Sequence, residues 1–144
     1  MTAHTYSRVA AEQELGATDE SRVADALLQI TMHDPDRDWV RETLIAHALV
    51  AARWPRAVAL TCLGHQVRID GVVEWSRVGP VLRRAVETGD ALLVDRADHA
   101  AWDMHAAVGI PTRQEIDHGF RSSWLTPDDA GGRVSDDPEG SEGP

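Results

Sequence analysis

Apolar residues recur at intervals of three and four along most of the chain, which is the spacing of one face of an α-helix. The first clear stripe, formed by Val23, Leu27 and Ile30, predicts a helix over residues 19–33. No segment shows the sustained alternation of apolar and polar residues that is typical of a half-buried strand. The pattern therefore predicts an all-α fold.

The middle of the chain, residues 34–71, predicts two helices joined by a very short connection. The first, over residues 38–53, is apolar on two sides, as expected for a helix with neighbours on both. Pro55 is predicted to open the second at its first position, where the missing N–H costs nothing. Gly64 falls on the buried side of that helix, where it costs about 1 kcal/mol relative to Ala. We therefore expect another helix to approach Gly64 closely.

Further helices follow the glycine at position 71, which is predicted to end this pair. One is expected over residues 78–88, with Gly89 as its stop, and another over residues 91–108. The sequence TRQE, which begins at Thr112, matches a capping box and predicts a last short helix. That helix is expected to cover the end of the helical stack with an apolar stripe of Ile116, Phe120 and Trp124.

The two ends of the chain differ in composition from its body. Residues 126–144 are rich in Gly, Pro and Ser and carry six acidic residues against one Arg, a net charge of −5. Such a segment buries too little apolar surface to offset the entropy of ordering it, so we expect a disordered acidic tail. Residues 1–18 are expected to be weakly structured, with at most a helical turn around residues 9–15. The helical domain is then predicted to span residues 19–125.

Charge and cysteine content narrow the choice of partners and compartment. The chain has a net charge of −10, and about half of it lies in the body, which disfavours non-specific binding of nucleic acid. A single cysteine, Cys62, excludes an intramolecular disulfide framework and suits a reducing cytosol. There is no signal-peptide h-region and no apolar run long enough for a membrane span. We expect a soluble, cytoplasmic protein.

The spacing Asp34-x-Asp36-x-Asp38 is similar to the opening of a calcium-binding loop. Such a loop requires glycine at its sixth position and a bidentate glutamate at its twelfth, where this chain has Trp39 and Ile45. These aspartates are therefore interpreted as a solvated turn that caps the next helix.

No other pattern predicts a metal or a reaction. Acidic and histidine side chains share the helix predicted over residues 91–108, but no HExxH motif or cysteine partner accompanies them, so we interpret them as a solvated face: Asp95, Asp98, His99, Asp103 and His105. His47 is expected to be a hydrogen-bonded core histidine. Cys62 lies three residues from His65, but no third group orients them, so Cys62 is expected to be a small buried side chain. The sequence thus predicts no cofactor and no catalytic residue.

The pairing of helices with a period of about 35 residues resembles the HEAT repeat class, and in particular small bacterial HEAT-repeat proteins. The resemblance covers roughly residues 20 to 108, and Arg56 stands where such repeats usually carry an arginine. It departs from the class where an Asp is usual before the second helix, since Ala52, Arg53 and Trp54 stand there. The segments that carry it are residues 31–36 (TMHDPD), Trp39-Val40, Arg96-Ala97-Asp98 and, above all, residues 61–65 (TCLGH).

The resemblance implies a short α-α superhelix of five or six antiparallel helices, in which the second helix of each pair lines the concave face. On that face the chain places polar and aromatic side chains that we expect to contact a partner: Thr61, His65, Arg68, Asp95, Asp98, Trp102 and His105. Trp and Arg are enriched among residues that dominate binding energy. Packing of Trp102 on the C-terminal cap helix is the open alternative. Structural roles are expected for Pro55, Arg56, Gly64, Gly71 and Gly89.

The class contains adaptors, toxin-neutralising immunity proteins, chromophore-lyase-like factors and a few enzymes, so the resemblance alone does not decide the function. We expect a non-catalytic protein-binding module, such as a bacterial immunity protein or an operon adaptor. An acidic body favours a basic partner protein. An enzyme or chromophore-lyase-like factor acting on a small molecule is the alternative. Nucleic-acid binding is a second alternative, disfavoured by the net charge.

Overall fold

The computed structural model describes residues 5–120, and within that range it contains seven α-helices and no strand. The all-α prediction is therefore confirmed. The helices are α1 (Arg8–Leu15), α2 (Glu20–His33), α3 (Arg37–Val50), α4 (Arg53–Asp70), α5 (Trp75–Glu87), α6 (Ala91–Val108) and α7 (Arg113–Asp117).

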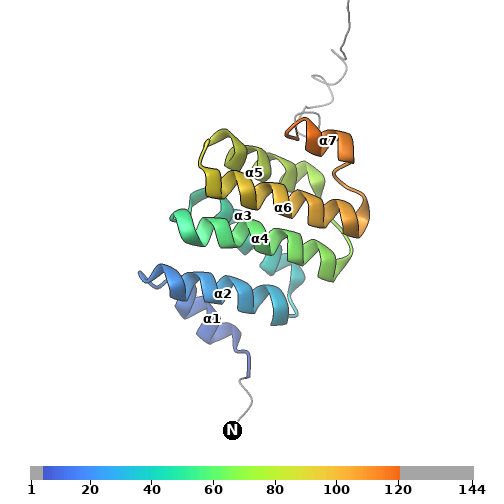
Figure 1. Cartoon of the computed structure of the whole chain (residues 1–144). Helices are drawn as coiled ribbons and strands as arrows, with labels where there is room; N and C mark the ends of the chain where they lie inside the picture. Colours follow the sequence, from blue (N-terminus) through green and yellow to red (C-terminus); the bar gives the residue numbers. More distant parts are fainter. Residues whose placement is uncertain (1–4, 121–144) are drawn as a thin grey trace, which may run out of the picture.

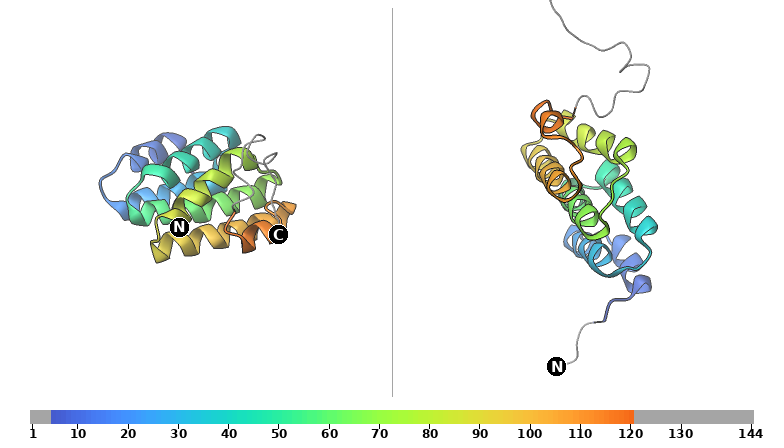
Figure 2. Two further views of the ribbon diagram at one scale, coloured as in Figure 1. Left: turned by 90° about the horizontal axis from the view of Figure 1, so that it is seen from above. Right: turned by 90° about the vertical axis from the view of Figure 1, so that its right-hand side faces the viewer.

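The helices form two layers. Helices α2, α4 and α6 lie side by side in one layer, with α4 in the middle (Figure 1). Helices α1, α3 and α5 form the second layer, which the right-hand view in Figure 2 shows as a separate column beside α2, α4 and α6. A short connection joins each helix of the second layer to the helix that follows it in the chain, which lies in the first layer. The pairs α1–α2, α3–α4 and α5–α6 are therefore antiparallel. The short helix α7 packs against α6 at the end of the stack.

Helix boundaries follow from capping side chains and left-handed glycines. Asp19, Asp36 and Asp90 each accept a backbone N–H at the start of α2, α3 and α6. The capping box predicted at Thr112 is present at the start of α7. Gly71 ends α4 with a φ of 73°, a conformation that glycine adopts without steric cost.

The core lies between the two layers and along the middle of α4. Leu60, Leu63 and Val67 of α4 are fully buried. They belong to one core cluster with buried side chains of α2, α3, α5 and α6, among them Leu27, Ile30, Val40, Leu44, Leu82 and Met104. The predicted close approach at Gly64 is confirmed, because a Cβ added there would lie 3.1 Å from the Cα of Ala100 on α6. This contact joins the two most extensively packed helices of the layer.

An ion pair fixes the turn between α2 and α3 to the far end of α4. Arg37 Nε donates to Asp70 Oδ1 at 2.7 Å, while its Nη1 donates to the carbonyl oxygens of Thr31 and Asp34. Gln66, which is buried, donates to the other carboxylate oxygen of Asp70. Backbone groups at the end of α2 are thereby satisfied by a side chain from α3.

Several expectations differ from the structure. Residues 8–15 form a complete helix with Ala11 in the core, rather than a weakly structured segment. Pro55 is the third residue of α4, not the first, because that helix already begins at Arg53. His47 is hydrogen-bonded as expected, with its Nδ1 2.9 Å from the Thr43 carbonyl oxygen, but it is half-buried and does not lie in the core.

The predicted cap over the end of the stack is formed in part. Helix α7 ends at Asp117, and Phe120 returns to the core through a turn in which its own φ is 68°, so Ile116 and Phe120 do not share one helical stripe. Both side chains are nevertheless buried. Trp124 and the acidic tail predicted over residues 126–144 lie outside the described residues.

Candidate functional site

The outer surface of the α2–α4–α6 layer carries a hollow of about 460 Å³. We refer to it as the tryptophan groove. It is lined by one residue of α2, three of α4 and four of α6: Leu28, Trp54, Val58, Thr61, Arg96, His99, Trp102 and Asp103.

Large apolar side chains in this groove are exposed to solvent. Trp54 in the first turn of α4 is 45% exposed, Trp102 on α6 is 38% exposed, and Leu28 on α2 is 37% exposed. The ring of Trp102 packs edge-on against His105, with ring centroids 5.6 Å apart. His105 in turn lies 2.9 Å from the carbonyl oxygen of Pro111 through its Nδ1, which fixes the imidazole ring against Trp102.

The charges around the groove are arranged in pairs. Arg68 on α4 lies 3.7 Å from Asp103 on α6, and its Nη2 contacts His65 Nδ1 at 3.0 Å. On the other side, Arg96 contacts the carboxylate of Asp95 at 2.7 Å. Paired charges of this kind contribute little to stability at an exposed site. The rim of the tryptophan groove is therefore close to electrically neutral around an apolar floor.

The expected partner-binding residues divide between two neighbouring surfaces. Thr61 and Trp102 line the tryptophan groove together, and His65 and Arg68 extend it through Asp103. The remaining aspartates, Asp95 and Asp98, line a different hollow on the other flank of α6. Their role in binding stays a prediction.

Only Thr61 and Trp102 of the eight residues that line the groove are among the binding residues predicted from the sequence. Leu28, Trp54 and Val58 are absent from the predicted binding residues, because helical periodicity gives the direction of a side chain but not which helix lies beside it. Trp54 immediately precedes Pro55, so the sequence places it in a turn, whereas it belongs to the first turn of α4. The sequence signal that could have revealed this residue is the presence of a tryptophan at the start of a predicted helix.

The second hollow, which we call the α6–α7 groove, has a volume of about 530 Å³. Its floor is apolar and its edge carries carboxylates from both helices. The lining residues are Val86, Ala91, Val94, Asp95, Asp98, Ile116, Asp117, Gly119 and Phe120.

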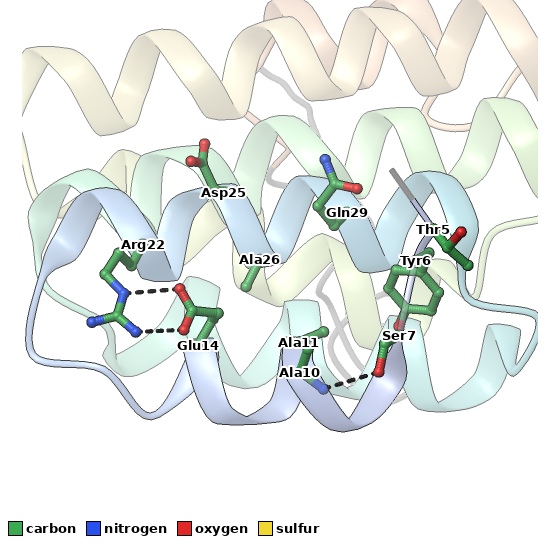
Figure 3. Close-up of a pocket in the computed structure, with 10 residues that line it drawn as sticks. All are labelled: Thr5, Tyr6, Ser7, Ala10, Ala11, Glu14, Arg22, Asp25, Ala26 and Gln29. Atoms are coloured by element: carbon green, nitrogen blue, oxygen red, sulfur yellow. Dashed lines mark hydrogen bonds and ion pairs between the residues drawn. The ribbon is translucent and has the colours of Figure 1, made fainter. Parts of the chain in front are cut away.

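A third hollow of about 500 Å³ lies between α1 and α2 (Figure 3). Two of its charged side chains are engaged with each other, since Arg22 Nε donates to Glu14 at 2.8 Å. The hydroxyl of Tyr6 donates to the buried carboxylate of Asp34, and burial together with this contact raises the pKa of Tyr6. These contacts join α1 and the residues before it to α2 and to the turn that follows α2.

The residues considered for chemistry occupy structural positions. Cys62 is fully buried, and burial raises the pKa of its thiol to about 11, so almost no thiolate exists at neutral pH. Asp34 accepts hydrogen bonds from Tyr6 and from the backbone of Asp36, and Asp36 caps α3 at Trp39. Between residues 5 and 120 no group of three or more potential ligands is placed to hold a metal ion.

No helix within the described range combines the length and the apolar character needed to cross a bilayer. Comparison of the chain with protein-family models, with curated proteins and with solved structures gives no match.

Proposed function

We propose that this chain is a non-catalytic protein-binding module whose helical pairs form a short HEAT-like superhelix. The observation that carries the proposal is the tryptophan groove, where Trp54 and Trp102 stand half-exposed on the layer formed by the second helix of each pair. In the HEAT class this layer is the concave, partner-binding face.

The physical argument is the energetic character of the groove. Burying a tryptophan against a partner removes a large apolar area from water while immobilising only two side-chain torsions. Such residues dominate the affinity of protein interfaces when they lie at the centre of a patch. Leu28 and Val58 contribute further apolar side chains to the lining of the groove. A partner helix with apolar side chains three and four residues apart would fit this surface.

The charge of the domain supports a basic partner. Residues 5–120 contain eighteen acidic residues and twelve arginines, so the described part of the chain has a net charge of −6. Long-range attraction would accelerate the encounter with a basic protein and lose strength at high salt. The HEAT resemblance and this charge together favour a bacterial immunity protein or operon adaptor that acts in the cytoplasm.

Affinity capture from cells that naturally produce the protein tests the proposal. The wild-type chain is compared with the double variant Trp54→Ala/Trp102→Ala, and with a matched control in which two exposed valines outside the groove are replaced, Val50→Ala/Val72→Ala. Val50 and Val72 are 83% and 60% exposed, so the control substitutions remove no core packing, and circular dichroism of the tryptophan variant checks that its fold is retained. One protein should be recovered with wild type and control and lost with the tryptophan variant.

Two results would overturn the proposal. Recovery of the same protein with the tryptophan variant would place the interface elsewhere. Tight binding of a small molecule or metal ion, with no reproducible protein partner, would favour an enzyme or a lyase-like factor instead.

A further inference from the structure

The α6–α7 groove combines two properties that the tryptophan groove does not. Its floor consists of apolar side chains from three helices and the turn after α7, while the charged residues that line it are all aspartates. Ile116 and Phe120 close the floor and are 6% and 2% exposed. These two side chains belong to the core beneath the groove, and the half-buried Val86 and Val94 provide the apolar surface that a partner can reach.

The position of Phe120 shows how the floor is held. Its backbone N–H donates to the carbonyl oxygen of Glu115 at 2.7 Å, which closes the turn after α7. Its ring packs edge-on against Trp75 of α5, with centroids 6.4 Å apart. Contacts from α5, α6 and α7 thus fix the shape of the groove before any partner arrives, and this lowers the entropic cost of binding.

Three carboxylates surround this floor, and none of the lining residues is an arginine or a lysine. Asp95 is engaged by Arg96 and lies near His99. Asp98 and Asp117 are exposed, and neither forms an ion pair with another residue in the described range. Their charges are available to attract a cation over an apolar surface, where water screens less than in bulk.

We infer that the α6–α7 groove is a second docking site, which takes a basic amphipathic segment of a partner protein. A bulky apolar side chain would cover the half-buried Val86 and Val94, and arginine or lysine side chains on either side would pair with Asp98 and Asp117. This inference goes beyond the tryptophan groove and does not depend on it.

Charge complementarity selects this occupant over others. The phosphates of nucleic acids and anionic lipids would be repelled by the carboxylates, and an acidic peptide would be repelled in the same way. A purely apolar segment would bury the carboxylates without a partner, which is costly. A segment with both apolar and basic side chains would cover the apolar floor and pair with the carboxylates at the edge.

The full-length protein can be titrated with a helical peptide of about 14 residues, with Arg on one face and Leu on the other. Anisotropy gives the affinity, and amide NMR spectra identify the surface that is contacted. Two matched peptides have Glu in place of Arg, or Ser in place of Leu. Only the Arg/Leu peptide should bind tightly, and it should shift the amide signals of Val94, Asp98, Ile116 and Phe120.

Charge-neutralising variants separate the groove from a general attraction to an acidic protein. Asp98→Asn/Asp117→Asn should weaken binding about tenfold, corresponding to two partly shielded ion pairs. The control Glu20→Gln/Asp25→Asn removes the same charge from exposed positions on α2 and should leave the affinity unchanged.

Three results would overturn the inference. The two double variants could weaken peptide binding equally, the peptide with Ser in place of Leu could bind as tightly as the Arg/Leu peptide, or the Arg/Leu peptide could fail to bind. A second control records the spectrum of Trp124→Ala without any peptide. If this substitution alone shifted the amide signals of the groove, the occupant would be the chain's own C-terminal segment, and the inference would be overturned. Signals that moved with protein concentration would identify a second copy of the chain instead.

Discussion

Gly64 of α4 packs against the backbone of Ala100 of α6, and a Cβ on Gly64 would lie only 3.1 Å from the Ala100 Cα. It would meet the side chain of Asp103 at nearly the same distance. This close approach brings α4 and α6 together along the length of the layer and places Asp103 near Arg68. The tryptophan groove, which spans these helices, depends on that spacing.

Replacing Gly64 with leucine should therefore force the two helices apart. Gly64→Leu is expected to lower the free energy of unfolding by about 1–3 kcal/mol, the usual cost of inserting bulk into a packed contact. Chemical denaturation followed by circular dichroism measures the change. Ala46→Leu places the same side chain at an exposed position of α3 and should have little effect. Equal stability of the two variants would contradict the proposed contact.

The ion pair between Arg53 and Asp90 should make stability depend on acid pH. Arg53 forms two hydrogen bonds with the Asp90 carboxylate, and this contact lowers the pKa of Asp90 to about 2. Because the folded pKa lies below the unfolded value of about 4, the contribution is present above pH 4 and disappears as the pH falls toward 2.

Asp90→Asn keeps an N-capping side chain on α6 but removes the charge. The variant should lose stability at neutral pH, and its stability should vary less than that of wild type between about pH 4 and pH 2. Thermal unfolding across this range measures both effects. Asp19→Asn makes the same change at the N-cap of α2 and should retain the acid dependence of wild type. An unchanged pH profile for Asp90→Asn would rule out this ion pair as its source.

Cys62 should be almost inert in the folded protein. Its side chain is fully buried, and the raised pKa leaves the thiol protonated at neutral pH. Reaction with a thiol-specific disulfide reagent at about pH 7.5, well below that pKa, should be slow in buffer and rapid in guanidinium chloride. Rapid reaction of the native protein would show that the thiol is accessible, and would reopen the possibility of a nucleophilic role.

Tyr6 should anchor helix α1 to the rest of the domain. Its hydroxyl donates to the carboxylate of Asp34, which is 2% exposed, and the neighbouring Arg8 stacks on the ring of Trp39 at 3.9 Å. Tyr6→Phe removes one hydrogen bond to a buried charge and should cost about 1–2 kcal/mol. Hydrogen exchange should accelerate in α1 and stay unchanged in α6. Equal exchange in wild type and variant would show that α1 is held by other contacts.

The sequence predicts well the features that depend on local chemistry. The helix expected over residues 91–108 has the bounds observed for α6, because Asp90 caps its start and glycine follows its end. The close approach at Gly64 is also predictable, since glycine lowers stability inside a helix and is suited to a buried face where a neighbouring backbone comes near. These signals lie within a few residues of the features that they determine.

Features that depend on contacts between distant segments could not be predicted. Helix α1 has a weak apolar pattern of its own, and its structure depends on Tyr6 and Arg8 reaching the turn between α2 and α3. The groove residues Leu28 and Trp54 come from different helices, so only the assembled layer shows that they are neighbours. The division of the expected binding residues between two flanks of α6 has the same cause, since periodicity does not reveal where α7 lies.

The central proposal is that the tryptophan groove contacts a protein partner. It is tested most directly by site-specific photo-crosslinking in cells that naturally produce the chain. A photo-reactive amino acid is placed at the position of His99, an exposed residue that lines the groove and leaves both tryptophans in place, and separately at the exposed control position of Val50 on the other layer. The proposal predicts a discrete cross-linked protein from position 99 and none from position 50. A cross-link to the same partner from position 50 alone, or no protein cross-link from position 99, would contradict it.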